Sequence, residues 1–457
     1  MSERCESAYG LKVFGSLRAE EEPWLGECFV PPSEFDGMVE ARSIIVFGPP
    51  GSGKSAVCRM MAAQVAPPHS SPLYLIVRWQ PTPPLWEPVA GFESVPGQVA
   101  YIFDLCALEV LRFVALYPDR WASAHPWARW LLAWFIRRFL RGDPKIRTAE
   151  LLEEAPGREI VADLLETERS EDLLPPGDWR LVTVEFVKAL QQLRLQGVWV
   201  MVDGLEAWLG ESRRLLPAFI SFLSTLPLFE EEAFAYKVFA PEAFYGPLLT
   251  AEGVSRYRFR VYHLSWSKEQ LEKIAVRRLA LALGRPEISL KDLCRSPQFL
   301  KWLRQVGGVS PRIWLESLRP VIIRYLETGK PVPVSEWKRL RNQVVPRITL
   351  DEENREVLVG GRNIPMKEIP SGALRILRYL YQNAGRIVPW DELYYKGYRQ
   401  MERIPHRGEP GYEEPSNYEN ILYSRLSDLR KKIEPDPKNP VCIETIRDEG
   451  VRLRVVW

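Results

Sequence analysis

A glycine-rich octapeptide early in the chain carries the first residues whose types and spacing suggest chemistry. Residues 48–55 have the sequence Gly-Pro-Pro-Gly-Ser-Gly-Lys-Ser, which fits a loop that wraps a polyphosphate. Glycines let backbone N–H groups point inward, Lys54 reaches the β- and γ-phosphates, and the Ser55 hydroxyl binds Mg²⁺. A glycine-rich turn without a ligand does not explain the Lys-Ser pair. The candidate nucleotide-binding residues are Gly48, Pro49, Pro50, Gly51, Ser52, Gly53, Lys54 and Ser55.

A second candidate position follows an apolar run later in the chain. Residues 198–202 are apolar and lead to Asp203, a carboxylate placed where it would hold Mg²⁺ through water. Three residues on, Glu206 is a candidate for orienting and deprotonating an attacking water. The alternative is that Glu206 is a solvated acid at a helix start, where the helix dipole favours it.

Strands and helices in alternation must position these groups. A short β-branched run at 43–47 precedes the octapeptide, and a helix is expected over 54–65. Further strands are expected over 73–79, 198–202, 236–240 and 258–264. This alternation predicts βαβ units in a mostly parallel sheet, the α/β fold of a P-loop NTPase, and residues 266–330 are expected to be helical.

The stretch of about 98–196 differs from the segments around it. It is long, helical and rich in aromatic residues, which indicates a helical insertion in the core. Aromatic residues at helical spacing are mostly core residues, so we expect its tryptophans to be buried. The tryptophans concerned are Trp121, Trp127, Trp130 and Trp134. A protein partner that binds through this insertion is the other possibility.

The composition argues against several classes of protein. The chain has 457 residues, of which 46% are hydrophobic and 26% charged, so wholesale disorder is not expected. The net charge of +2 excludes a dominant polybasic character but allows a local basic face. The six cysteines form no CxxC pair and the four histidines no HExxH motif, which argues against a zinc site. We expect a cytoplasmic protein with neither a signal peptide nor a membrane span.

Residues of about 25–330 resemble the AAA+/STAND branch of P-loop ATPases, particularly its origin-recognition-like members. The resemblance rests on the octapeptide, Asp203-Gly-Leu-Glu206, the segments 255–266 and 277–279, and Gly-Gly-Val-Ser-Pro-Arg at 307–312. It implies ATP and Mg²⁺ as cofactors. It also implies Arg312 as a lid residue that reaches the γ-phosphate, with a surface arginine at a helix start as the alternative. Arg256 would act as an arginine finger on a neighbouring subunit's nucleotide, although an ordinary charge at a strand edge is the favoured interpretation.

One residue departs from this resemblance. The fourth strand is expected to end near Ala240, where the family usually has a polar residue that senses the γ-phosphate. Alanine cannot orient a water, so we expect low ATPase turnover and favour a nucleotide switch. Enzymatic activity is therefore left open, with a slow ATPase as the favoured outcome.

Residues of about 345–457 resemble the winged helix-turn-helix output domain of OmpR/PhoB-type response regulators. The resemblance rests on strands near 348–350 and 357–359, a helix entry at 385–393, Leu-Arg-Lys-Lys-Ile at 429–433 and a terminal hairpin. It implies a recognition helix over 417–433 that enters the major groove of duplex DNA. The candidate DNA contacts are Asn420, Ser424, Arg425, Lys431, Lys432, Arg447 and Arg452. Asp448 and Glu449 oppose phosphate approach at the wing tip, so a winged helix used for protein contact is the alternative.

These expectations divide the chain into five parts. They are a lead-in over 1–42, an ATPase core over 43–265, a lid over 266–330, a linker over 331–346 and a winged helix-turn-helix domain over 347–457. The favoured hypothesis is a slowly hydrolysing signal-transduction switch coupled to a DNA-binding domain, in transcription regulation or another DNA transaction. Two alternatives remain: an oligomeric origin-recognition-like DNA-remodelling or loader ATPase, and a nucleotide-bound scaffold whose winged helix binds protein. A homo-oligomer is left open.

Overall fold

The structure is a computed structural model, and the part of the chain that it describes has several gaps. The described residues are 10–15, 17–66, 73–80, 94–166, 179–208, 212–225, 233–251, 254, 259–306, 310–352, 355–360, 362–447 and 449–454.

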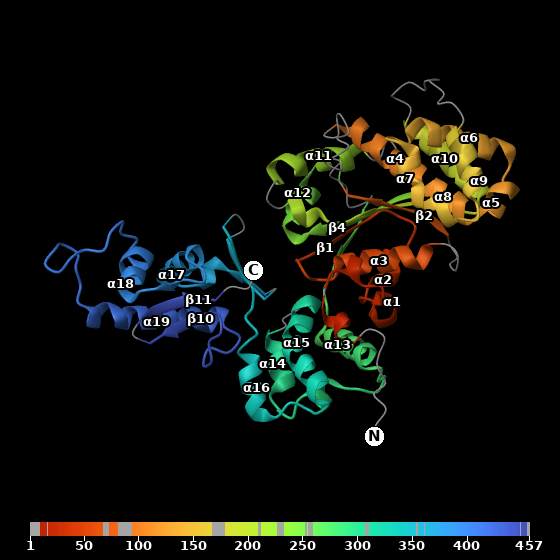
Figure 1. The fold of residues 1–457 in the computed structure, drawn as a ribbon. Coiled ribbons are helices and arrows are strands. Elements are labelled where there is room, and N and C mark those ends of the chain that lie inside the picture. The colour runs from red at the N-terminus through yellow and green to blue at the C-terminus, as the bar shows by residue number, and fades with distance from the viewer. Residues whose placement is uncertain are drawn as a thin grey trace.

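A five-stranded sheet forms the centre of the N-terminal part (Figure 1). Its strands are β1 (Ile44–Gly48), β2 (Tyr74–Trp79), β3 (Gly197–Val202), β4 (Phe234–Pro241) and β5 (Arg260–His263). They lie in the order β2-β3-β4-β1-β5, and each neighbouring pair is parallel. Strands β1, β3 and β4 are buried at every position, as expected when helices cover both faces of a sheet. The predicted parallel α/β sheet is confirmed.

Alternate side chains of these strands enter two different cores. Phe47 and Val200 pack in one core with the helices of the insertion. Ile44 and Trp199 pack in the other, with the helix after β1, the lid and the lead-in. The helices that complete this part are α3 (Lys54–Val65), η3 (Leu205–Trp208), α11 (Ser212–Thr225), η5 (Glu242–Phe244) and α12 (Tyr245–Thr250).

The insertion between β2 and β3 is helical, as predicted. Its helices are α4 (Val95–Leu116), α5 (Pro118–Ser123), α6 (Pro126–Phe139), α7 (Pro144–Arg147), α8 (Ala149–Glu154), α9 (Arg158–Glu166) and α10 (Trp179–Gln192). Trp121 is buried, but Trp130 is 69% exposed and Trp127 39% exposed. The expectation of buried tryptophans is therefore wrong for these two, because they lie on the face of α6 opposite the buried Leu132 and Phe135.

The lid and the lead-in pack together. The lid contains α13 (Lys268–Leu283), η6 (Leu290–Leu293), α14 (Phe299–Val306) and α15 (Pro311–Thr328). The lead-in contains η1 (Gly10–Phe14), η2 (Ala19–Glu21), α1 (Leu25–Cys28) and α2 (Phe35–Met38). Phe14 and Trp24 of the lead-in share a core with Leu318 of the lid. Helix α16 (Val334–Arg341) lies in the range expected to be a linker, and its Trp337 is buried against Phe299.

The C-terminal module, residues 347–454 as described, has its own core. One antiparallel sheet contains β6 (Ile348–Asp351), β7 (Glu356–Val359) and β8 (Arg362–Pro365). The second contains β9 (Ile387–Val388), β10 (Ile443–Ile446) and β11 (Gly450–Leu453). The helices are η7 (Met366–Glu368), α17 (Ser371–Gln382), α18 (Trp390–Glu392), the π-helical η8 (Leu393–Tyr398) and α19 (Pro415–Ile433). Helix α19 confirms the helix predicted over 417–433.

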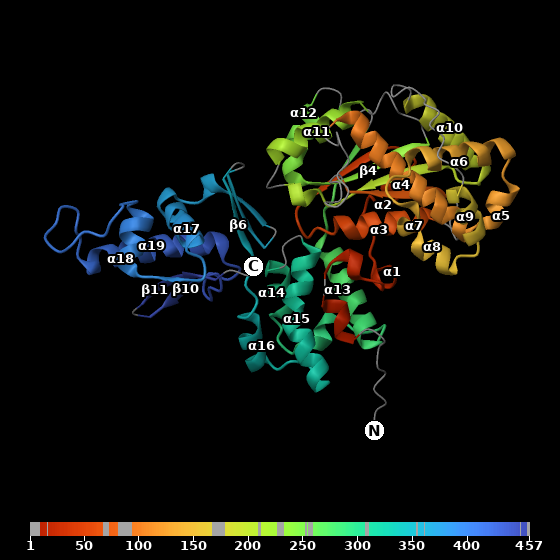
Figure 2. The ribbon, with the colours of Figure 1, turned by 45° about the horizontal axis from the view of Figure 1, so that its top comes forward.

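Two views agree on how these parts are arranged. The C-terminal module lies beside the lid, and the insertion lies at the other end of the molecule (Figures 1 and 2). The Arg454 guanidinium donates to the Asn342 carbonyl at 3.3 Å, which joins the module to the segment after α16. In the described residues, no helix is long and apolar enough to cross a membrane.

Candidate functional site

The loop between β1 and α3 has the backbone shape that an anion-binding loop requires. Gly51 and Gly53 have φ values of +79° and +92°, which side chains with a Cβ rarely adopt. Helix α3 begins at Lys54, and the first amides of a helix have no carbonyl partner within the helix. Those amides and the positive end of the helix dipole favour a phosphate at this position.

Lys54 lies in this loop with its ammonium group held in place. The side chain is buried, and Nζ donates to the carbonyl oxygens of Gly48 at 2.6 Å and Pro49 at 3.1 Å. Nζ also forms an ion pair with Oε1 of Glu206 at 2.6 Å. Glu206 thus neutralises Lys54 in this arrangement, and a phosphate that binds Lys54 must compete with it. The structure brings Glu206 to the phosphate loop, where it contacts the lysine, and its expected role toward water stays a prediction.

Asp203 follows the last residue of β3 and meets Ser55 at the start of α3. Burial raises the pKa of the Asp203 carboxyl, while hydrogen bonds from the Ser55 hydroxyl and from the Gly204 backbone lower it. The second oxygen, Oδ1, is buried and makes no hydrogen bond within the described residues. An orphaned carboxylate oxygen beside a hydroxyl fits a Mg²⁺ ion, which prefers oxygen ligands.

The protein would supply few ligands to such an ion. Among the described residues, no group of three acidic, histidine or cysteine side chains is close enough to hold a metal. Mg²⁺ usually keeps several waters and binds through one or two protein oxygens plus substrate phosphates. Ser55 and Asp203 therefore suit a Mg²⁺ that arrives with a nucleotide.

Ala240 lies near the end of β4, the strand between β1 and β3. It pairs in register with Phe47, and it is fully buried. The structure thus puts an apolar residue beside the strand that leads into the phosphate loop. The alanine side chain itself has no polar group with which to orient a water.

Three lid residues bind the outer side of the same loop. The Trp266 indole donates to the Ser52 carbonyl at 2.7 Å, and the Ser310 hydroxyl donates to the Gly51 carbonyl at 3.1 Å. The Arg312 backbone N–H also donates to that carbonyl, at 3.4 Å. A Cβ added at Gly51 would lie 3.1 Å from both Ser310 Oγ and Arg312 Cβ. Glycine is therefore needed at this position for close approach as well as for its φ.

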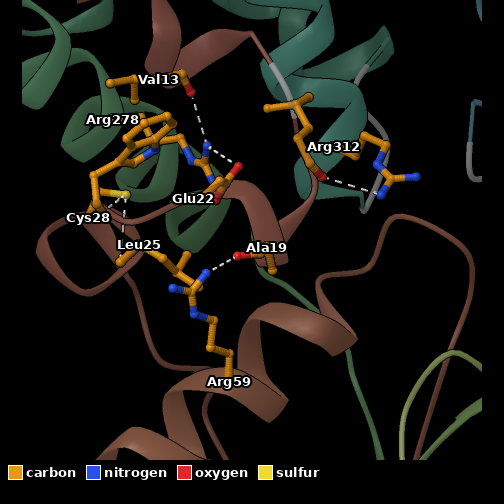
Figure 3. A network of polar contacts seen from close by, with 10 residues as sticks. Val13, Ala19, Glu22, Leu25, Cys28, Arg59, Arg278 and Arg312 are labelled. Carbon is orange, nitrogen blue, oxygen red and sulfur yellow. Dashed lines mark hydrogen bonds and ion pairs between the residues drawn. The ribbon is translucent and has the colours of Figure 1, made fainter. Parts of the chain in front are cut away.

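The Arg312 side chain extends toward the lead-in. Its guanidinium donates to the Leu17 carbonyl at 3.4 Å (Figure 3). It lines a pocket of about 230 Å³ with Phe14 and Arg319. The γ-phosphate role expected for Arg312 stays a prediction, since only its backbone is bonded to the phosphate loop. Arg256, the candidate arginine finger, lies outside the described residues.

A buried ion pair that the sequence analysis did not identify joins the lead-in to the lid. The Arg278 guanidinium contacts both Glu22 oxygens, at 2.9 and 2.6 Å, and donates to the Val13 carbonyl at 3.1 Å (Figure 3). Arg59 of α3 donates to the Ala19 carbonyl. The lead-in is therefore bonded to the lid and to the helix that follows the phosphate loop. Glu22, an acid between the buried Ala19 and the buried Trp24, is the signal that could have suggested it.

The candidate DNA contacts lie on α19 and the hairpin of the C-terminal module, apart from the phosphate loop. Arg425 and Lys431 each lie 3.6 Å from an oxygen of Asp428. Lys432 lies 3.6 Å from Glu368, and Arg452 lies 2.6 Å from Glu444. The Asn420 amide donates to the Ser416 carbonyl at 3.0 Å, and Ser424 and Arg447 are exposed. The four cations with these ion pairs are thus balanced by nearby acids.

Arg430 is a structural residue of α19 that the sequence analysis did not single out. Its guanidinium donates to the Ile443 carbonyl at 2.9 Å and to the Thr445 hydroxyl at 2.6 Å. Burial lowers the pKa of Arg430. Arg430 therefore fixes the hairpin against the helix.

Comparisons with known proteins find solved structures similar to this chain, among them the following two. The Orc1 protein of Aeropyrum pernix, solved in complex with DNA, is 12% identical, with 95% of this chain and 92% of that chain covered and a TM-score of 0.36. Cdc6p from Pyrobaculum aerophilum is 12% identical, with 96% and 92% covered and a TM-score of 0.34. No family model and no curated protein matches the chain. TM-scores this low do not establish a common fold, so the assignments rest on the chain's own residues.

Proposed function

We propose that this protein binds ATP with Mg²⁺, hydrolyses it slowly, and uses the bound nucleotide to control a DNA-binding C-terminal module. The observation that supports the nucleotide site is the meeting of Lys54, Ser55, Asp203 and Glu206 at one glycine-rich loop. Mg²⁺ bound with the triphosphate would neutralise charge on the phosphate oxygens. Lys54 would bind the phosphates, and Glu206, released from Lys54, would orient and deprotonate water. The buried Ala240 argues for slow turnover.

The start of α15 supplies a short connection between the nucleotide loop and the C-terminal module. Arg312 bonds to Gly51 through its backbone, and Ile313 follows directly. A Cβ added at Gly360, in the turn between β7 and β8, would lie 3.5 Å from the Val306 carbonyl and 3.9 Å from Ile313 Cδ1. A shift of α15 on nucleotide binding would therefore reach the C-terminal module directly.

The C-terminal module would act as a winged helix. Helix α19 would lie in the major groove, with Arg425 facing base edges and Lys431 and Lys432 facing phosphates. The hairpin of β10 and β11, with Arg447 and Arg452, would form the wing. This assignment is supported by the order of helices and hairpin and by the sequence resemblance.

A second candidate function is an oligomeric DNA-remodelling or loader ATPase of the origin-recognition-like kind. The position of α15, bonded to the loop and close to Gly360 of the module, would serve this function equally well. It differs in requiring a residue from a neighbouring subunit, for which Arg256 is the candidate. Loss of DNA-stimulated hydrolysis in Arg256→Ala, with ATP binding intact, would favour it over a monomeric switch.

The test is ATP hydrolysis by the full-length protein with and without duplex DNA, together with ATP binding. We expect measurable ATP binding in the wild type and in Glu206→Gln, and its loss in Lys54→Ala. Hydrolysis should be slow in the wild type, stimulated by DNA, and lost in both variants. ATP binding that survives in Lys54→Ala would overturn the nucleotide site. Hydrolysis unchanged in Glu206→Gln would remove Glu206 from the reaction.

A further inference from the structure

Helix α6 of the insertion has two sides of different chemistry. The side that packs into the insertion core carries Leu132, Phe135 and Ile136, all buried. The outward side carries Trp130, which is 69% exposed, and Trp127. An indole is a large apolar group, and exposing two of them on one short helix calls for a binding role.

The spacing along α6 places the tryptophans in a row. Trp127, Trp130 and Trp134 differ by three and four residues, so at 100° per residue they lie within a sector of about 60°. They are separated by about 4.5 and 6 Å along the axis. Trp134 is half-buried against Phe139, with the ring centroids 6.0 Å apart, and it forms the inner end of the row.

The charged side chains of α6 itself all have one sign. Arg137 and Arg138 follow the tryptophans on the outward side, and Arg138 is exposed. The helix contains no aspartate or glutamate. The face therefore favours an anionic ligand that also offers flat apolar surfaces.

A single-stranded nucleic acid has this chemistry. Each base presents a π-face that stacks on an aromatic ring regardless of sequence, and each phosphate pairs with a cation. The tryptophan spacing exceeds the 3.4 Å step between stacked bases of one DNA strand, so the strand must be extended with its bases separated. In a duplex the bases are already stacked and paired, so their faces are not free to stack on the indoles.

A lipid surface fits this face less well. Helices that lie in a membrane interface insert a broad apolar face rich in leucine and phenylalanine. In α6 Leu132, Phe135 and Phe139 are buried in the protein core, and the large apolar side chains that are exposed are those of Trp127 and Trp130. The buried apolar side is thus unavailable to a bilayer.

We propose that the outward face of α6, formed by Trp127, Trp130, Trp134, Arg137 and Arg138, binds single-stranded nucleic acid by base stacking and phosphate pairing. This goes beyond the proposed function, which assigns duplex DNA to the C-terminal module. The two surfaces lie at opposite ends of the molecule (Figures 1 and 2). One protein can therefore hold a duplex and a nearby single strand at once.

The test is fluorescence anisotropy of a labelled oligothymidylate of about 20 nucleotides, titrated with the full-length protein at several salt concentrations. We expect Trp130→Ala to weaken binding by at least about five-fold, and the Trp127→Ala/Trp130→Ala double variant to weaken it further. Trp130→Phe should restore part of the affinity. Arg138→Ala should reduce the slope of log affinity against log salt by about 0.7.

Leu181→Ala is the matched control, because Leu181 is 46% exposed on the adjacent helix α10 and has no π-face. It should bind the oligonucleotide like the wild type. Duplex binding, measured in parallel, should be unaffected by the tryptophan substitutions, which separates this proposal from the function of the C-terminal module. Oligothymidylate binding that is undetectable in the wild type, or unchanged in Trp127→Ala/Trp130→Ala, would overturn the proposal and point to a protein partner for this face.

Discussion

Charged side chains around the lead-in and on the C-terminal helix are paired in different ways. Glu22 and Arg278 are buried, lie 256 residues apart in the sequence, and form a pair with two hydrogen bonds. Arg425 and Lys431 share Asp428 on the surface, one helical turn away on the same helix. Breaking a buried pair leaves an uncompensated charge, whereas an exposed pair contributes little and can be exchanged for a phosphate. The first kind fixes the structure, and the second leaves cations available to a ligand.

The largest expected effect is on stability, from breaking the buried pair. Glu22→Ala should lower the free energy of unfolding by about 3–5 kcal/mol, because Arg278 stays buried without its partner. Chemical denaturation of the full-length protein measures this. Glu21→Ala is the control, since the exposed Glu21 lies 3.7 Å from Arg18 on the next turn. It should cost less than about 0.5 kcal/mol, and equal losses in the two variants would contradict the contrast.

The second prediction concerns the nucleotide loop, where Lys54 is a buried cation paired with Glu206 and its removal should have a large effect. Lys54→Ala removes the ammonium that would bind two phosphates and leaves Glu206 to repel them, so ATP affinity should fall by at least about 100-fold. Isothermal titration calorimetry with ATP and Mg²⁺ measures it. Lys330→Ala, at an exposed lysine after α15, should leave the affinity unchanged. A Lys54→Ala protein that is folded and still binds ATP normally would contradict the assignment of the loop.

Local sequence patterns were sufficient to predict this loop. Gly51, Gly53 and Lys54 are adjacent in sequence, and their backbone conformations follow from glycine and a helix start. The meeting of Asp203 with Ser55 also follows, since each lies beyond the carboxyl end of a strand of the same parallel sheet, β3 for Asp203 and β1 for Ser55, with β4 between them. Contacts between distant segments were not predictable in this way. No sequence pattern near Glu22 predicts that Arg278 is its partner.

The tryptophans of α6 teach a related lesson. The abundance of aromatic residues in a helical stretch led to the expectation that its tryptophans belong to the core. The helical period separates Trp130 from Phe135 by about 140°, so both cannot face the same core. Applying the period to individual residues would have identified the exposed face. What the exposed indoles bind depends on surface chemistry that only the folded insertion brings together.

The exposed pairs on α19 should respond to substitution through DNA binding and not through stability. Lys431→Ala should reduce the slope of log affinity for duplex DNA against log salt by about 0.9, with stability changed by less than about 0.5 kcal/mol. Asp428→Asn removes the acid between two cations, so it should strengthen binding. A salt titration by anisotropy measures both variants. Duplex affinity insensitive to both substitutions would show that α19 does not face DNA.

The smallest expected effect is on stability, from the pair of Arg386 with Glu392 in the C-terminal module, whose burial is intermediate. Arg386 and the Tyr379 hydroxyl both donate to Glu392, and they lower the pKa of Glu392 to about 2. Because the folded state holds this carboxylate ionised, its contribution is complete above the unfolded pKa of about 4.3 and is lost as the pH falls toward 2. Arg386 is half-exposed, so the contribution should be only about 1 kcal/mol.

Denaturation of the wild type and Glu392→Gln at pH 7 and pH 3 measures that contribution. The wild type should be more stable than the variant at pH 7. The difference should narrow at pH 3, because Glu392 is then mostly protonated in the unfolded state and must lose that proton on folding. Glu352→Gln is a surface comparison, because the Glu352 side chain is 54% exposed and water therefore reaches its pair with Arg378 more freely. Its effect should be smaller at both pH values. A Glu392 effect that is no larger than that of Glu352, or that is independent of pH, would place the Glu392 pair with the exposed pairs of α19 and would extend that pattern to the whole module.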